Sequence, residues 1–217
     1  RRVKPRPWGM VVVLCFFASL ILFYPYFTTF FASALTPDSE WAYEDTNIYA
    51  LQDNFGLSGE GIRVCIVDTG IDMSHPDFSN VNLAGYRDLI EENHNTIQDR
   101  GEEMHGTMMA GILVANGDFR GAAPNVELLV AAALNAVGTT KSESTVADAI
   151  EWCWAQMDAD IISLSLGGDP DPENPLGSET ADAVQDALNQ GVFIVSAAGN
   201  SGGAGTGVTD VSVPANV

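Results

Sequence analysis

The chain has 217 residues, of which 46% are hydrophobic and 18% charged, a composition that suits one globular core and excludes a mainly disordered protein. Nine Lys and Arg residues against 29 Asp and Glu residues give a formal net charge of −20, which excludes nucleic acid as an expected partner. Four of the basic residues precede residue 35, so the rest of the chain has 5 basic residues against the 29 acidic ones. Such an excess suits either a protein that is soluble in high salt, where repulsion is screened, or an ordinary acidic secreted protein.

Residues 8–31 form an uncharged apolar run that follows four basic residues. Its length is close to the ~20 residues that a membrane-spanning helix needs, so it predicts a transmembrane anchor with the basic flank in the cytoplasm. The alternative is a signal peptide cleaved after Ala34, because residues 32–34 have the small-x-small form of a cleavage site. The run exceeds the roughly 7–15 apolar residues usual in signal peptides, which favours the anchor. The expected location is therefore the cell membrane with the following domain outside the cytoplasm, or secretion if the segment is cleaved.

The rest of the chain divides into a polar, turn-rich linker at residues 35–55 and a globular domain at residues 56–217. Short apolar runs predict buried strands; they lie at residues 62–67, 126–132, 160–166 and 192–197. Helical patterns separate them, and strands that alternate with helices indicate an α/β fold with a mostly parallel sheet.

Three of these helices have recognisable limits or faces. A helix with Val146, Ile150, Cys153, Trp154 and Met157 on one face is expected to be capped by Thr145. Another opens near Ser178, turns Ala181, Val184, Ala187 and Leu188 inward and ends at Gly191. A third is expected at residues 108–115, after His105.

The cysteines Cys15, Cys65 and Cys153 have none of the close spacings that mark metal sites or redox pairs. Each is expected to be a small buried hydrophobic residue, with at most one disulfide in the chain.

Residues that follow the apolar runs carry the candidate chemistry, because active residues collect at the carboxyl ends of parallel strands. Asp68 follows the first strand and His105 opens a helix, so the pair could form a carboxylate–imidazole couple in which the histidine is a general base. Asn200 follows small residues after the last strand, where its amide could stabilise a developing oxyanion.

Four motifs occur in order: DTGID at residues 68–72, HGT at 105–107, SLSLGG at 163–168 and AAGN at 197–200. Each alone is weak, but their order and their places on strands and helices together resemble the subtilisin-like serine protease family. The resemblance runs from about Gly56 to Val217. It implies a three-layer fold with a mostly parallel sheet, here preceded by one transmembrane helix, and endopeptidase activity on extended polypeptide substrates.

The same resemblance implies roles for individual residues. Asp68 and His105 match the catalytic aspartate and histidine, and Asn200 matches the oxyanion-hole side chain. The residues that match substrate-binding positions are Ser165, Leu166, Gly167 and Gly168, which pair with an extended substrate, and Ala197, Ala198 and Gly199, which form a wall of the primary specificity pocket. The family's nucleophilic serine lies in a later segment, beyond Val217. Residues 56–217 are therefore expected to be a peptidase domain incomplete at its carboxyl end and inactive alone.

Other reactive residues are weaker candidates. Residues 199–203 fit the G-x-S-x-G pattern of a hydrolase elbow, but no histidine follows them. Ser163 and Ser165 lie within a strand run, where hydroxyls usually bond to the backbone. His75 and His94 have no metal-ligand spacing and are expected to be solvated.

No cofactor is required by this reading, and no metal site is assigned. Asp77 matches an aspartate that binds calcium in some relatives, but the loop at residues 116–120 is shorter than their calcium loop. The many carboxylates are compatible with weak calcium binding.

Two other functions are each compatible with part of the sequence. A non-catalytic, protease-like peptide-binding module would need no nucleophile. The Asp–His–Asn set argues against it, because binding alone does not require those three residues. A dinucleotide-binding domain is suggested by Gly56, Gly59 and Gly61, but these glycines precede the first strand where a phosphate-binding loop would follow it.

Overall fold

The computed structural model describes residues 11–13, 15–19, 21–24, 40–91, 96–169, 173, 178–200 and 211–217. The chain divides into two compact units, residues 1–49 and 50–217. In the first unit, helix α2 (Glu40–Asp45) is followed by the start of α3 (Ile48–Phe55). These helices occupy most of the predicted turn-rich linker, so the expectation of turns there was wrong. Residues 40–55 contain neither Gly nor Pro, and the helical stretch is interrupted only by a turn at Thr46 and Asn47, where Asn47 has φ 58°.

Within the described part of the chain, no helix combines the length and apolar character that crossing a membrane requires. The predicted span at residues 8–31 and the cleavage motif at residues 32–34 lie partly or wholly outside the described residues. Both therefore stay predictions.

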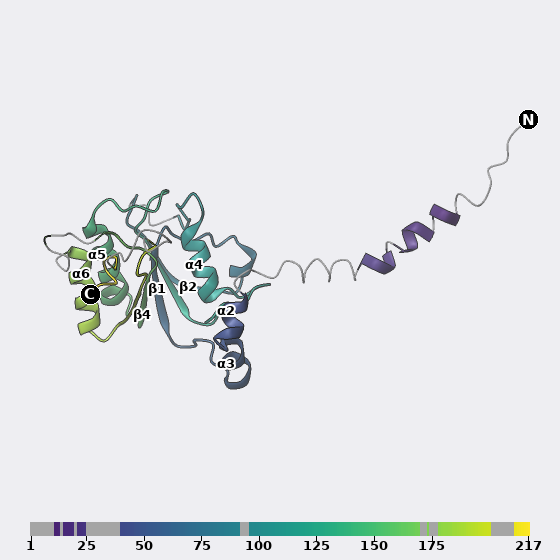
Figure 1. Cartoon of the computed structure of the whole chain (residues 1–217), viewed down its shortest axis with the longest axis horizontal. Coiled ribbons are helices and arrows are strands. Elements are labelled where there is room, and N and C mark those ends of the chain that lie inside the picture. The colour runs from purple at the N-terminus through teal and green to yellow at the C-terminus, as the bar shows by residue number, and fades with distance from the viewer. Residues whose placement is uncertain are drawn as a thin grey trace, which may run out of the picture. The chain divides into compact units, whose positions relative to one another are not determined.

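The centre of the second unit is a five-stranded parallel sheet with the strand order β2-β3-β1-β4-β5 (Figure 1). The strands are β1 (Arg63–Asp68), β2 (Asn82–Asp88), β3 (Glu127–Ala132), β4 (Ile161–Leu164) and β5 (Phe193–Ser196). The four strands expected from apolar runs are present, and the expected α/β class with a parallel sheet is confirmed. Asp68 and Asp88, the last residues of β1 and β2, both lie in register with Ala132 of β3. Polar side chains from separate strands thus meet at one edge of the sheet.

Strand β2 was not predicted, because its sequence NLAGYRD has neither an apolar run nor strong strand formers at most positions. It is an edge strand that pairs only with β3 among the described strands, and its register shifts between Leu83 and Gly85. A Cβ at Gly85 would lie 2.6 Å from the Met157 side chain and 3.0 Å from that of Leu129. The β2 backbone can pack closely on these side chains only because residue 85 is a glycine. The same glycine lowers the strand propensity of the segment.

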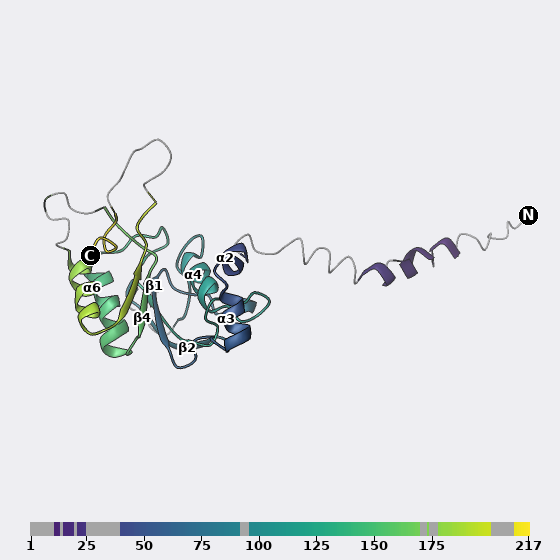
Figure 2. The same cartoon turned by 60° about the horizontal axis from the view of Figure 1, so that its bottom comes forward.

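Helices cover both sides of the sheet. Figures 1 and 2 show α5 and α6 on one side and α4 on the other. The helices and short helical turns of this unit are η1 (Pro76–Phe78), α4 (His105–Val114), α5 (Glu143–Glu151), η2 (Trp152–Gln156) and α6 (Glu179–Asn189). This arrangement gives three layers, helix, sheet and helix.

The local details of α5 and α6 correct two expectations. Helix α5 is capped by Ser142, whose hydroxyl accepts the Thr145 N–H, and Thr145 itself lies inside the helix. Leu188 of α6 is 41% exposed, whereas Ala181, Val184 and Ala187 are buried as predicted. Gly191 follows this helix with φ +87°, a left-handed conformation that suits glycine at a helix end.

The core consists of two clusters, one on each face of the sheet. On the α5–α6 side, alternate residues such as Val67, Leu129 and Ile162 are buried together. On the α4 side, Ile66 and Leu128 belong to the second cluster. Strands β1 and β3 are therefore buried on both faces, which explains their continuous apolar sequences.

A disulfide joins Cys65 of β1 to Cys153 of η2, and both residues are fully buried. The expectation that each was a separate small hydrophobic residue was wrong for this pair. The chain separation of 88 residues hides the pairing, which depends on η2 packing directly beneath β1 with a Cα–Cα distance of 5.9 Å. Cys15 is free and exposed.

Candidate active site

The side chains of Asp68 and His105 form a hydrogen-bonded pair at the carboxyl edge of the sheet. His105 Nδ1 lies 2.8 Å from Oδ1 and 3.0 Å from Oδ2 of Asp68. An ionised carboxylate only accepts hydrogen bonds, so Nδ1 carries the proton and donates it. The His105 side chain is 43% exposed while that of Asp68 is inaccessible. The carboxylate thus holds the imidazole from behind, and Nε2 is left as the basic nitrogen.

Burial raises the pKa of the Asp68 carboxyl, and this effect exceeds the opposing effects of its hydrogen bonds to His105 and to the Thr69 N–H. The Thr69 N–H donates to Oδ1 at 2.7 Å. A buried carboxylate with a perturbed pKa beside an exposed imidazole is characteristic of functional sites.

The glycines of the DTG and HGT motifs bring the two side chains together. A Cβ added at Gly106 would lie 2.2 Å from the Gly70 carbonyl oxygen, so the two backbones touch where neither residue has a side chain. Gly70 has φ +120°, which also favours glycine. Contact between these turns places His105, the first residue of α4, over the end of β1.

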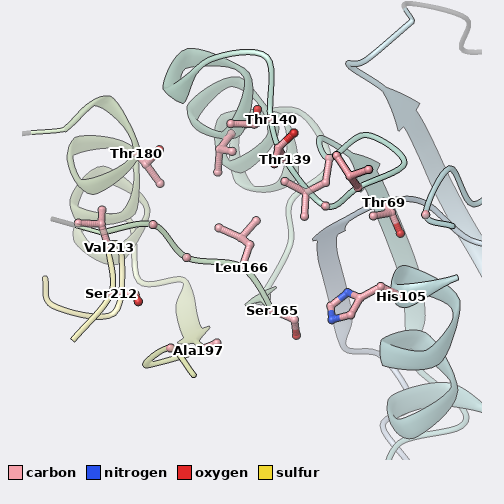
Figure 3. A pocket seen from close by; sticks show the side chains of 18 of the residues that line it. Thr69, His105, Thr139, Thr140, Ser165, Leu166, Thr180, Ala197, Ser212 and Val213 are labelled. Carbon is pink, nitrogen blue, oxygen red and sulfur yellow. The ribbon is translucent and has the colours of Figure 1, made fainter. Parts of the chain in front are cut away.

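A cleft of about 1170 Å³ opens beside His105. Figure 3 shows the His105 ring pointing from the start of α4 toward the segment that contains Ser165 and Leu166, with Ala197, Ser212 and Val213 beyond it. The sequence-predicted residues that line the cleft are His105, Ser165, Leu166, Gly167, Gly168, Ala197, Gly199 and Asn200. Ala198 is not among the lining residues, and its carbonyl accepts the Ser212 N–H.

The segments at residues 165–168 and 197–200 line the cleft. Gly168 and Val213 form an antiparallel bridge with two hydrogen bonds of 3.1 and 3.0 Å, which ties the end of the Ser165–Gly168 segment in place. Asn200, four residues after the end of β5, is exposed. The arrangement can hold an extended chain beside the His105 imidazole.

Ser212 is a cleft residue that the sequence did not reveal. A Cβ at Gly199 would lie 2.4 Å from its hydroxyl oxygen, and one at Gly167 would lie 2.9 Å from its Cβ. The two glycines therefore make room for Ser212 between the cleft walls. Ser212 belongs to none of the recognised motifs. Only the folded structure brings it next to Gly167 and Gly199.

Acidic side chains also line the cleft. They are Glu102, Glu103, Glu143 and Asp169, and the described lining includes no Lys or Arg. Glu102 and Glu103 directly precede the His105 turn, whereas Glu143 begins α5.

Asp77 closes a short loop with its carboxylate. Its Oδ1 accepts the backbone N–H groups of Asp118 at 2.8 Å and Phe119 at 3.2 Å, and its carbonyl accepts the Asn116 N–H at 2.7 Å. Across the residues that the structure describes, no group of three or more His, Cys, Asp or Glu residues is arranged to hold a metal ion. Asp77 Oδ1 is therefore engaged by backbone N–H groups that close the loop.

Among the weaker candidates, Ser165 lines the cleft and follows β4, so it does not lie within a strand as expected, whereas the others lie apart from the Asp68–His105 pair or outside the described residues. The His75 side chain caps η1 by accepting the Asp77 N–H. His94 and Ser201, the latter from the suspected hydrolase elbow, lie outside the described residues. Ser163 lies inside β4.

Comparison with known proteins identifies relatives. The family model described as "Subtilase family" matches residues 59–217. The major intracellular serine protease of Bacillus subtilis is 34% identical over 165 residues, which cover 74% of this chain and 49% of that protein. The minor extracellular protease Vpr of the same organism is 36% identical over 157 residues, covering 69% of this chain and 19% of Vpr. Subtilisin E, also from Bacillus subtilis, is 34% identical over 164 residues, covering 74% and 39%. The chain thus spans half or less of the length of these relatives.

Proposed function

Because the chain belongs to the subtilase family, we propose that it is the first part of the catalytic domain of an exported serine endopeptidase. The observation that carries the proposal is the 2.8 Å hydrogen bond between buried Asp68 and exposed His105 at the edge of a peptide-sized cleft. The substrate is an extended polypeptide, and no nucleic acid is involved.

The reaction is acyl transfer to a serine. His105 Nε2 removes the proton from the serine hydroxyl as its oxygen attacks the scissile carbonyl, and the imidazolium then protonates the leaving amine. Asp68 keeps the imidazole in the Nδ1–H tautomer and stabilises its charged form. Asn200 donates from its amide to the oxyanion of the tetrahedral intermediate. Residues 165–168 bind the substrate backbone as an added strand, and Ala197, Ala198 and Gly199 form one wall of the pocket for the side chain next to the cleaved bond.

The nucleophile belongs to a segment beyond Val217. Support comes from the α4 side of the sheet, where Phe193 is 65% exposed and Val195 50% exposed on β5. Large apolar side chains on a strand of a parallel sheet are ordinarily covered. A segment packed there would lie beside α4 and could bring a serine to His105.

The protein is anchored in the cell membrane by residues 8–31, with the peptidase domain outside the cytoplasm, or it is secreted after cleavage following Ala34. The Cys65–Cys153 disulfide supports an oxidising compartment, where such bonds form and persist. No cofactor is required, and calcium binds weakly if at all.

The test is peptide hydrolysis by the protein produced from its complete natural gene. Active enzyme should be labelled by a fluorophosphonate on a serine that follows Val217, and His105→Ala should abolish the labelling. Binding of unstructured peptides without hydrolysis or labelling would contradict the proposal and favour a protease-like binding module.

A further inference from the structure

We propose that Asp99 is a positioning residue for the reaction: its carboxylate holds together the two turns that carry Asp68 and His105. The catalytic part of this inference rests on the proposed function. Asp99 lies six residues before His105 and belongs to none of the motifs that identify the site.

The first carboxylate oxygen of Asp99 binds the turn after β1. Oδ1 accepts the Thr69 hydroxyl at 2.6 Å and the Gly101 N–H at 2.9 Å. Thr69 is 1% exposed, and its own N–H donates to the Asp68 carboxylate. Asp99 is therefore connected to Asp68 through a single buried residue.

The second oxygen binds the start of α4. Oδ2 accepts both the N–H of Thr107 at 2.8 Å and its hydroxyl at 2.5 Å. The N-cap residue of this helix, Met104, has φ 54° and makes no side-chain capping hydrogen bond. Asp99 thus satisfies a free N–H of the first helical turn from outside the helix, where a negative charge also favours the helix dipole.

Thr69 completes the connection. A hydroxyl has one proton to donate, and Asp99 receives that of Thr69, so the oxygen lone pairs are free to accept the Gly106 N–H at 2.9 Å. His105 lies directly before Gly106, so the same hydroxyl fixes the turn that carries the imidazole. Only an acceptor-only carboxylate fits all four bonds, because an Asn amide nitrogen would face the Thr107 N–H in one orientation and the Gly101 N–H in the other, and it can accept neither.

The loop has other attachments, so removal of the charge should leave the fold in place. The Ile71 N–H donates to the Gln98 carbonyl at 3.2 Å, and the Arg100 N–H donates to the Thr69 carbonyl at 2.9 Å. Loss of the carboxylate should loosen the orientation of His105 without detaching the loop.

The experiment compares Asp99→Asn and Thr69→Val in the complete natural protein. We expect kcat to fall roughly 10- to 100-fold with KM within about threefold, because misplaced reacting groups slow chemistry more than they weaken binding. The downfield proton NMR signal of His105 Nδ1–H should broaden or disappear in both variants. Thr69→Ser, which retains the hydroxyl, should recover most of the loss. The double variant should lose no more than the worse single variant, because both changes break one connection.

Asp118→Asn, which removes an exposed charge on the loop closed by Asp77, is the matched control and should change neither readout. If Asp99→Asn and Thr69→Val match the control in kcat and keep the NMR signal, even with lower thermal stability, the proposal is overturned. Should Asp99→Asn not fold, the difference between Thr69→Val and Thr69→Ser decides. An unsubstituted protein without activity would refute the proposed function alone, because the NMR signal still reports whether Asp99 orients the imidazole.

Discussion

The two halves of the sheet are built differently. Strands β1 and β3 are buried on both faces, and Cys65, Leu129 and Ala131 have no exposed surface. Strand β5 has every second residue at least half exposed, and its neighbour β4 is only partly buried at Ile161 and Ser163. The buried half ends in the Asp68–His105 pair, whereas the open half ends in the segments that line the cleft.

This difference separates two tasks. A carboxylate that orients an imidazole must be desolvated and immobile, which requires packing on both sides. A surface that accepts an extended chain must leave backbone groups accessible. Mutations in the buried half should therefore affect stability and the catalytic pair, whereas mutations in the open half should mainly affect how substrate is held.

The largest effect is expected at the pair itself. In the complete protein, His105→Ala should lower kcat/KM by about 10⁴-fold or more, a magnitude taken from subtilisin and not calculated from this structure. Ser165→Ala in the open half should cost less than about tenfold, because substrate pairing there uses backbone groups. Equal losses in a peptide hydrolysis assay would show that the two halves do not divide the tasks in this way.

The second effect concerns charge in the buried half. Burial by itself raises the pKa of Asp88, but its hydrogen bonds to the Arg100 side chain and to the N–H groups of Glu91 and Ile90 outweigh it and lower the pKa. The stability that Asp88 contributes is therefore present at neutral pH and is lost as the pH falls below about 4. Asp88→Asn should reduce the unfolding free energy by roughly 3 kcal/mol at pH 7, because Arg100 loses its buried partner, and the loss should become smaller as the pH falls through the lowered pKa of Asp88.

Asp68 should behave in the opposite sense. Its raised pKa means that folding favours its protonated form, so its contribution to stability is present at low pH and is lost as the pH rises through the folded-state pKa. Urea unfolding of Asp68→Asn should therefore show little loss, or a gain, at pH 7. A loss as large as that of Asp88→Asn would contradict the inference that burial of the Asp68 carboxylate opposes folding at neutral pH.

The third effect measures the covalent link in the buried half. Replacing Cys65 by Val and Cys153 by Ala should lower the unfolding free energy by about 2–4 kcal/mol, because the disulfide restricts a long loop in the unfolded chain. Non-reducing urea titrations of both proteins give the difference, and reduction of the natural protein should reproduce it. No change on reduction would mean that the buried half gains nothing from this bond.

The fourth effect lies at the Asp77 loop, outside both halves. Asp77→Ala should cost about 1–3 kcal/mol, because it leaves the N–H groups of Asp118 and Phe119 without their acceptor. Chelation with EDTA should shift the melting temperature by less than about 2 °C, since stabilisation by an ion depends on its binding to the folded state. A large decrease on chelation would show that calcium binds tightly elsewhere.

The sequence predicted strands of both halves of the sheet, but it did not predict the contacts that depend on tertiary structure. Continuous apolar runs identified β1, β3, β4 and β5. The position of Asp68 at a strand end and of His105 at a helix start predicted that the two side chains would pair. Strand β2 was missed because packing against β3 and Met157, rather than its own residues, makes it a strand. Ser212, Asp99 and the Cys65–Cys153 bond were missed for a related reason. Their partners are distant in sequence or carry no motif, so only tertiary structure brings them together.

The smallest effect is expected along the rim of the cleft. Glu102, Glu103, Glu143 and Asp169 line it, while the described lining has no basic residue, so peptides with Lys or Arg near the cleaved bond should be preferred over matched peptides with Glu. These side chains are exposed, and exposed charge pairs are worth only about 0.2–1 kcal/mol each, which predicts a preference of roughly three- to tenfold in kcat/KM. The preference should shrink at 1 M salt, where the screening length falls to about 3 Å.

The variants Glu103→Gln and Glu143→Gln should each reduce this preference, whereas Asp118→Asn, which lies outside the cleft lining, should not. The hydrogen bond between Asp68 and His105 should be far less sensitive to salt, because the Asp68 side chain is inaccessible to solvent. If the rim preference persists unchanged in molar salt, it comes from desolvated contacts. In that case bound substrate would bury the acidic side chains of the cleft about as completely as the fold buries β1 and β3.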